Sequence, residues 1–67
     1  MHKPRLLRLP DVRIKTGLSR STIYERMADE TFPSAINLGG RSVAWIEAEI
    51  DDWILKQIQK SRVAGGR

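Results

Sequence analysis

Polar side chains that can bind anions gather near position 20 of this 67-residue chain. Ser19, Arg20, Ser21 and Thr22 are consecutive and offer one guanidinium and three hydroxyls. Such groups donate hydrogen bonds to phosphate oxygens and to the polar edges of planar molecules. Catalytic chemistry has far less support, because the chain has no cysteine and its single histidine, His2, lies at the chain end, where order is usually low. We therefore expect a binding protein that is not an enzyme and that has no metal site and no cofactor.

The charges of the chain are distributed unevenly. In total, 12 Lys and Arg residues against 8 Asp and Glu residues leave a formal net charge of +4. Residues 1–26 hold seven basic and two acidic side chains, whereas residues 27–67 hold five basic and six acidic ones. The concentration of positive charge in the first part favours a polyanionic partner or an acidic surface, and the alternative is a contribution to solubility alone.

Length and hydropathy limit the architecture. A chain of this size buries about 60% of the surface that its unfolded form exposes, so it builds one small core and no second domain. The longest apolar run spans only residues 43–46, which is much shorter than a signal peptide or a membrane-spanning helix requires. We expect one cytoplasmic domain over residues 1–60 and a disordered tail over residues 61–67, where no hydrophobic period is visible.

Two short helices are expected to position the polar cluster. The first covers residues 9–16, with a proline in its first turn and Gly17 behind its end. Ser19 can cap a second helix, in which Ile23 and Met27 share the buried side. The connection between the helices has only about three residues, so they must cross at a steep angle. The outward face of the second helix is then formed by Arg20, Ser21, Thr22, Tyr24 and Glu25.

A β-hairpin and a third helix follow. Residues 35–38 and 43–45 are apolar stretches on either side of a glycine pair, which predicts a two-stranded hairpin packed on the helices from one face only. Residues 47–60 carry apolar side chains at helical spacing, with acids in the first turns and bases at the end. The predicted fold class is therefore mainly α with a small β-hairpin, in the order helix, helix, strand, strand, helix.

The largest apolar side chains are expected to form the core. Trp45, Trp53, Ile23 and Leu18 each lie in phase with the apolar positions of their own elements, so we expect them to share one core. Both tryptophans are accordingly assigned to the core and not to base stacking. For Tyr24 two alternatives remain open: its ring packs on the side of the core with the hydroxyl in water, or it takes part in binding.

This order of elements is typical of a winged helix-turn-helix protein. The major groove of DNA, about 12 Å wide, admits one protruding helix whose N-terminal residues reach the base edges. The free N–H groups at the helix start and the hydroxyls of Ser19 and Ser21 would favour a phosphate there. Arg41, in the glycine-containing hairpin turn, could lie along a DNA backbone or in a minor groove. The structural alternatives are that Ser19 serves only as an N-cap and that Arg41 is a solvated turn residue.

Five segments together resemble the AlpA family of phage and prophage transcriptional regulators. In chain order they are Leu6-Leu7-Arg8-Leu9-Pro10-Asp11-Val12, Thr16-Gly17-Leu18-Ser19-Arg20-Ser21-Thr22-Ile23-Tyr24-Glu25, Phe32-Pro33, Leu38-Gly39-Gly40-Arg41-Ser42-Val43-Ala44-Trp45 and Glu47-Ala48-Glu49-Ile50-Asp51-Asp52-Trp53-Ile54. The resemblance covers about residues 5–58. No single segment is diagnostic of the family, and the resemblance is specific because all five segments occur in this order and at this spacing. The family is similar to excisionase-like and MerR-type winged helix-turn-helix proteins. This chain departs from the common pattern at Asp29-Glu30-Thr31, where members place a glycine, and at Gly40, where they place a proline.

The resemblance implies a sequence-specific DNA-binding transcriptional regulator of phage or prophage type. It assigns residues 19–24 to the start of the recognition helix and residues 39–42 to the wing. Double-stranded DNA is the expected partner, RNA polymerase or an integrase are candidate protein partners, and a membrane is not expected. The chain is expected to act as a monomer or in cooperative arrays on repeated sites. The candidate DNA-binding residues are Ser19, Arg20, Ser21, Thr22, Tyr24, Glu25, Arg41, Ser42, Arg5 and Arg8.

Two other functions remain as alternatives. An excisionase would bind repeated sites, bend the DNA and direct an integrase without regulating transcription. A protein-interaction module, which is a different class, would use the polar helix to bind an acidic partner.

Overall fold

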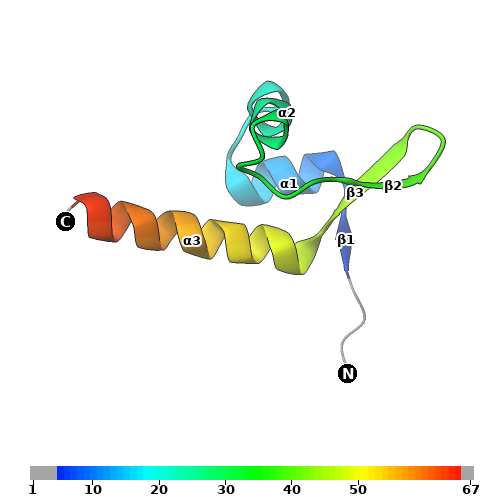
Figure 1. The fold of residues 1–67 in the computed structure, drawn as a ribbon. Coiled ribbons are helices and arrows are strands. Elements are labelled where there is room, and N and C mark those ends of the chain that lie inside the picture. The colour runs from blue at the N-terminus through cyan, green and yellow to red at the C-terminus, as the bar shows by residue number, and fades with distance from the viewer. Residues whose placement is uncertain (1–4, 66–67) are drawn as a thin grey trace.

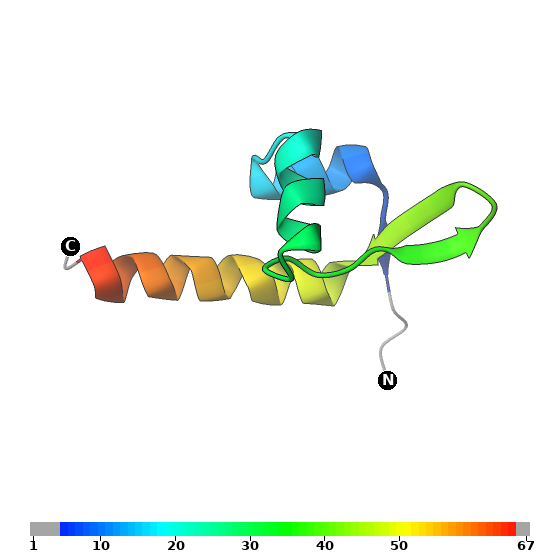
Figure 2. The same ribbon diagram turned by 45° about the horizontal axis from the view of Figure 1, so that its top comes forward.

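The computed structural model describes residues 5–65. Helices α1 and α2 cross above the first half of the long helix α3, and a hairpin projects from the end of the molecule where α3 begins (Figures 1 and 2). The helix, helix, strand, strand, helix order is confirmed, with one short strand added at the start. The elements are β1 (Leu6–Leu7), α1 (Leu9–Thr16), α2 (Arg20–Ala28), β2 (Ile36–Gly39), β3 (Ser42–Ile46) and α3 (Glu47–Gly65).

The three residues between α1 and α2 set the crossing of the two helices. Gly17 has a φ of 74°, a left-handed conformation that glycine adopts without strain, and its N–H donates to the Arg13 carbonyl at 2.8 Å. Ser19 is extended, and its Oγ accepts a hydrogen bond from the Thr22 N–H at 3.2 Å. The predicted end of α1 and the predicted N-cap of α2 are therefore both confirmed.

Helix α2 ends at Ala28 in a turn that usually contains glycine. The N–H of Thr31 donates to the Arg26 carbonyl at 2.8 Å, and the N–H of Glu30 donates to the Met27 carbonyl at 3.1 Å. These two bonds define a Schellman motif, whose left-handed position is usually glycine. Here the position is Glu30, with a φ of 61°. The side chain costs conformational energy there because its Cβ crowds the backbone.

The sheet has three strands in the order β1-β3-β2, and all neighbours are antiparallel. Strand β1 was not predicted from the sequence, because two residues are too few to show an alternating pattern. Strand β1 pairs Leu7 with Trp45, while β2 pairs Ile36 with Ala44. The two-stranded sheet that we expected is therefore one part of a sheet with β3 at its centre.

The prediction that the hairpin packs from one face only is wrong. Ala44 and Trp45 are adjacent on β3 and point to opposite faces, yet both are fully buried. Ile36 and Leu38 on the edge strand β2 are 37% and 46% exposed. The cause is the position of the strands: the end of β3 packs against α1 and α3, whereas β2 and the hairpin turn project beyond the helices (Figure 2).

The core is one cluster that draws on all three helices. Its fully or nearly fully buried members are Leu7, Val12, Ile23, Phe32, Trp45 and Ile50. Leu18 and Trp53 pack against this cluster while partly buried, so the predicted shared core is confirmed. The indole N–H groups of both tryptophans donate to the loop after α2, Trp53 to the Thr31 carbonyl at 2.7 Å and Trp45 to the Pro33 carbonyl at 3.1 Å.

Helix α3 is longer than the sequence pattern indicated. We expected it to end near Lys60, but it continues to Gly65, so residues 61–65 are helical in this structure. No proline or glycine interrupts residues 47–64, and basic side chains near the end complement the helix dipole. That residues 61–67 form a tail outside the domain stays a prediction, and residues 66–67 lie outside the described residues. Within residues 5–65, no helix is both long and apolar enough to cross a membrane.

Candidate nucleic-acid interface

The first turn of α2 is polar and carries no acidic side chain. Ser19 Oγ accepts from the Thr22 N–H and donates its own hydrogen to Thr22 Oγ1 at 3.0 Å. Arg20 and Ser21 are exposed beside this cap. Helices α1 and α3 each have acidic residues in their first turns, whereas α2 has none. The positive end of the α2 dipole is therefore not compensated by its own side chains, which favours an anion there.

Tyr24 connects the start of α2 with the core. Tyr24 is 38% exposed, and its ring meets the buried Trp45 ring edge-on, with 6.3 Å between the ring centroids. The guanidinium carbon of Arg20 lies 5.4 Å from the Tyr24 ring centroid, which is a cation–π geometry. Of the two alternatives for Tyr24, the structure supports packing on the side of the core. A part in binding stays a prediction, as does the role of the exposed Glu25 one residue further along α2.

The hairpin β2–β3, which we call the wing, ends in a turn with internal hydrogen bonding. Asn37 Oδ1 accepts the N–H of Gly39 at 2.7 Å, and Gly39 and Gly40 have φ angles of 116° and 57°. Both glycines are needed, since these backbone conformations are unfavourable for residues with a Cβ. Arg41 is exposed at the tip, and Ser42 is half-buried at the start of β3. The wing thus holds one free guanidinium at its far end.

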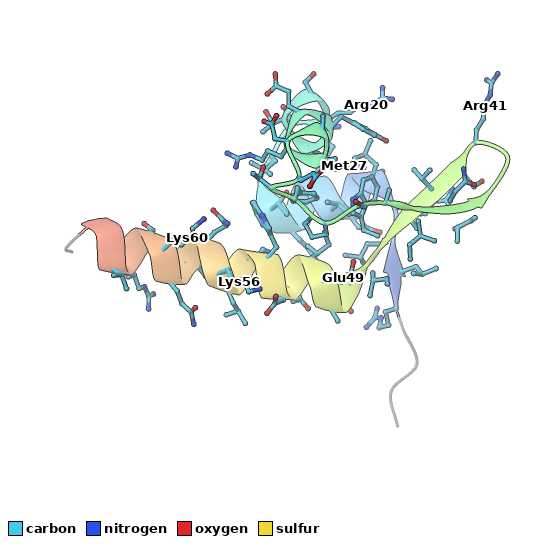
Figure 3. The ribbon with its side chains drawn as sticks, viewed as in Figure 1. Arg20, Met27, Arg41, Glu49, Lys56 and Lys60 are labelled. Carbon is cyan, nitrogen blue, oxygen red and sulfur yellow. The ribbon has the colours of Figure 1, made fainter. Side chains whose placement is uncertain are left out.

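Arg20 and Arg41 lie on the same side of the molecule. In Figure 3 Arg20 extends from the start of α2 and Arg41 from the tip of the wing, both away from α3. The labelled side chains Glu49, Lys56 and Lys60 belong to α3 instead. The structure therefore brings the two arginines, which are 21 positions apart in the sequence, to one face of the protein.

The two N-terminal candidates have different surroundings. Arg5 Nε lies 3.6 Å from Glu47 Oε1 at the start of α3, and the Arg5 carbonyl accepts the Glu47 N–H at 2.8 Å. Part of its charge is therefore compensated within the protein. Arg8 is the N-cap residue of α1, and its side chain is exposed. Arg8 is thus the better candidate of the two for a contact with a polyanion.

Arg13 is a candidate that sequence analysis missed. It lines a shallow hollow together with Ile14, Gly17 and Ser19, at the junction of α1 and α2. Its side chain is exposed, and none of the ion pairs found within residues 5–65 includes it. Arg13 belongs to the basic first part of the sequence. Its position beside Ser19 depends on the angle between the two helices, which the sequence does not show.

Lys15 has a structural role and is not free for a ligand. Its Nζ lies 2.7 Å from Asp51 Oδ1 and 3.2 Å from Glu47 Oε2, so it ties the end of α1 to the first turns of α3. The hydrogen bond to Asp51, and after it the one to Glu47, raises the pKa of Lys15 above its ordinary value. The acidic start of α3 therefore pairs with basic side chains of the N-terminal region.

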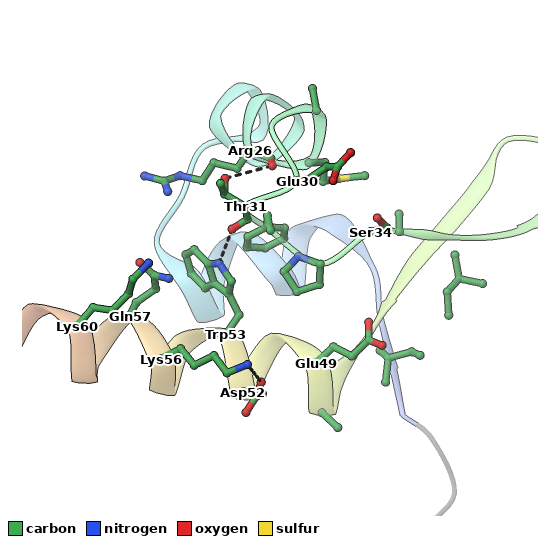
Figure 4. Close-up of a pocket in the computed structure, with 18 of the residues that line it drawn as sticks. Arg26, Glu30, Thr31, Ser34, Glu49, Asp52, Trp53, Lys56, Gln57 and Lys60 are labelled. Carbon is green, nitrogen blue, oxygen red and sulfur yellow. Dashed lines mark hydrogen bonds and ion pairs between the residues drawn. The ribbon is translucent and has the colours of Figure 1, made fainter.

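A larger hollow lies between α3 and the segment that follows α2 (Figure 4). Its lining mixes both charges, and Lys56 Nζ is paired with Asp52 Oδ2 at 3.1 Å. The Nε of Arg26 is buried there without a hydrogen-bond partner. Because its charges are mixed, this hollow is a poorer match to a polyanion than the face that carries Arg20 and Arg41. Among residues 5–65, no group of three or more His, Asp or Glu side chains could hold a metal ion.

Helices α1 and α2 with the hairpin define a winged helix-turn-helix protein. Comparison with known families agrees with this class: residues 5–58 match the family described as "Prophage CP4-57 regulatory protein (AlpA)". The match covers well over half of the chain. The protein belongs to the AlpA family of prophage regulatory proteins, which confirms the resemblance noted in the sequence.

Two curated relatives are similar to this chain. The "DNA-binding transcriptional activator AlpA" of Escherichia coli (strain K12) is 52% identical over an alignment of 56 residues, and the match covers 75% of this chain and 80% of that protein. The "Uncharacterized protein ORF88" of Enterobacteria phage P4 is 46% identical over 54 residues, which are 81% of this chain and 61% of that protein. No solved structure matches the chain.

Proposed function

We propose that this protein binds specific sites on double-stranded DNA and regulates transcription of phage or prophage genes. The observation that carries the proposal is the shared face of Arg20, at the acid-free start of α2, and Arg41, at the tip of the wing (Figure 3). A duplex offers phosphates and base edges to such a face at the same time. The name of the relative from Escherichia coli, a transcriptional activator, supports regulation and makes activation the expected direction.

In the proposed complex the first turn of α2 enters the major groove. The Ser19 hydroxyl donates its hydrogen to Thr22 Oγ1, so the side-chain donors that remain free in this turn are on Arg20, Ser21 and Thr22. The guanidinium of Arg20 can donate two parallel hydrogen bonds to one guanine, which is a common specific contact in the major groove. The Tyr24 ring below it restricts its orientation and so lowers the entropy that binding costs. Thr22 offers its methyl group to a neighbouring thymine methyl.

The wing contributes a contact of a different kind. Arg41 follows two glycines with left-handed φ angles and has no bulky neighbour in the turn. A guanidinium in that setting suits the DNA backbone or a minor groove, where it adds affinity and orientation. We therefore assign recognition of the bases to α2 and contact with the DNA backbone or the minor groove to the wing.

The test is a selection of bound fragments from random and genomic DNA, followed by a reporter assay with the selected site. We expect one enriched motif and a change in reporter expression that depends on the protein. An excisionase would instead change recombination when integrase is supplied from elsewhere, so an excision assay is run in parallel. Absence of DNA binding at low salt, where charge attraction is strongest, would replace this proposal by a protein-interaction module.

A further inference from the structure

The second half of α3 has an exposed apolar surface. The helix has 19 residues and runs past α1 and α2 (Figures 1 and 2). Ile50 is fully buried and Trp53 is partly buried, so the first half is docked on the core. Leu55 and Ile58, roughly a third of a turn around the helix, are 57% and 40% exposed.

These two residues belong to a regular row along α3. Asp51, Leu55, Ile58 and Arg62 follow one another at spacings of four, three and four residues. This is the spacing of positions that face a partner helix in a coiled coil. The row, which we call the α3 seam, has an apolar centre, an acidic end and a basic end. The sequence alone does not show this row, because it does not tell which apolar residues of α3 the core leaves uncovered.

The charges along α3, in the seam and beside it, select the orientation of a partner helix. The acids Glu47, Glu49, Asp51 and Asp52 occupy the first two turns of α3, while the bases Lys56, Lys60 and Arg62 occupy its second half. A parallel copy of α3 would place acid beside acid and base beside base. An antiparallel copy places the acidic half of each helix beside the basic half of the other, and like charges are separated.

We propose that α3 pairs with α3 of a second copy of this protein, antiparallel, about a twofold axis between residues 56 and 57. Leu55 of one copy then lies on Ile58 of the other, and Asp51 lies opposite Arg62. Such an interface is self-complementary, as a symmetric dimer requires. Asp51 already accepts a hydrogen bond from Lys15, but its side chain remains 51% exposed to the incoming guanidinium.

The small size of the seam makes the contact weak in the free protein. Two apolar side chains per copy bury much less than the roughly 1,000 Å² that a stable interface needs. Two copies on neighbouring DNA sites meet at a high effective concentration, so the same contact becomes strong enough to couple them. The coupling on DNA rests on the proposed function, whereas pairing of the free chains does not.

Disulfide cross-linking tests the pairing without DNA. The chain has no cysteine, so single-cysteine variants are unambiguous. An equal mixture of L55C and I58C is expected to form the 55–58 cross-link at least about 10-fold faster than V63C cross-links to itself, given the gain in effective concentration. Val63 is the matched control, since it is 83% exposed but lies outside the seam. Faster cross-linking of L55C with itself would show a parallel pair, and equal rates for all variants would show no pairing; either result overturns the proposal.

Cooperative DNA binding tests the role of the pairing. The L55E variant is compared with V63E and the wild type on duplexes with one site and with two adjacent sites. We expect L55E to bind the one-site duplex with the affinity of the wild type. On the two-site duplex it should lose the cooperativity between the bound copies, so that its apparent affinity falls about 10-fold or more below that of the wild type. V63E should resemble the wild type. If L55E retains the wild-type coupling, the seam is not the contact; if every variant fails to bind one site, the proposed function is what has failed.

Discussion

At the residue scale, Arg20 and Arg41 are expected to contribute differently to DNA binding. Arg20→Ala removes a base contact, so it should cost about 1 to 3 kcal/mol on the cognate site and little on a scrambled one. Thr22→Ala should relax discrimination in the same way. Arg41→Ala removes a backbone contact and should weaken binding to both duplexes nearly equally. The measurement is the Kd of each variant on cognate and scrambled duplexes at several salt concentrations.

Lys60→Ala is the control for that comparison, because it removes the same charge from α3, away from the proposed interface (Figure 3). It should change neither affinity nor discrimination appreciably. The roles are reversed if Arg41→Ala selectively abolishes the preference for the cognate site while Arg20→Ala and Thr22→Ala leave it intact.

Glu30 makes a second prediction at this scale. Its φ of 61° is unfavourable for a residue with a Cβ, and the side chain is exposed. Glu30→Gly relieves that strain but adds freedom to the unfolded chain, so the net gain should be about 0.5 to 1 kcal/mol. Urea or thermal unfolding measures it. Asp29→Gly is the matched control, because Asp29 has a φ of −81° and glycine there can only destabilise; equal effects of the two changes would contradict the explanation.

At the scale of the elements, Trp53 is expected to hold α3 on the domain. Its indole lies edge-on to Phe32, with 4.8 Å between ring centroids, and its N–H donates to the Thr31 carbonyl at 2.7 Å. Trp53→Ala should cost about 3 kcal/mol, comparable with the whole net stability of so small a domain, and should largely unfold it. Thermal unfolding followed by circular dichroism measures the effect.

Trp53→Phe separates the two contributions of this side chain. It keeps an aromatic ring against Phe32 but loses the hydrogen bond and part of the buried indole surface, so it should cost about 1 to 2 kcal/mol, less than Trp53→Ala, and leave a cooperative transition. An unchanged transition in Trp53→Ala would mean that α3 is not held by this residue.

The elements that the sequence predicted well are those with local signals. Gly17 and Ser19 mark the boundaries of α1 and α2 by their own chemistry, and the structure has both boundaries there. Strand β1 has no such signal, because Leu6 and Leu7 become a strand only through pairing with β3. The end of α3 was misplaced because the loss of hydrophobic period at Ser61 was interpreted as loss of the helix.

The candidate site also contains parts that local sequence predicts and parts that it does not. The polar first turn of α2 and the tip of the wing follow from local sequence. The position of Arg13 beside Ser19 and the pairing of Arg5 with Glu47 depend on how distant elements meet, so no local pattern shows them. The stacking of Arg20 on Tyr24 is an exception that could have been found, since residues four apart on a helix are neighbours.

At the scale of the whole molecule, the distribution of charge predicts a defined salt dependence. Within residues 5–65, the ion pairs engage Arg5, Lys15 and Lys56, and they leave unpaired the exposed Arg8, Arg13, Arg20 and Arg41. Arg26 is unpaired as well, but it lines the hollow between α3 and the segment after α2. Arg20 is assigned to a base, so Arg8, Arg13 and Arg41 together with the start of α2 offer about four phosphate contacts. The logarithm of affinity should then fall with the logarithm of salt concentration with a slope of about −4.

The same charge distribution predicts which variants change that slope. Arg13→Ala and Arg41→Ala should each reduce its magnitude by about one, because each removes one phosphate contact. Arg5→Ala should have a smaller effect, since Glu47 already compensates part of the Arg5 charge. Titrations of one cognate duplex over a range of salt concentrations measure all of these slopes. A slope near zero for the wild type would count against DNA as the partner, and a full unit of change in Arg5→Ala alone would place the duplex along β1 and the start of α3 instead of along α2 and the wing.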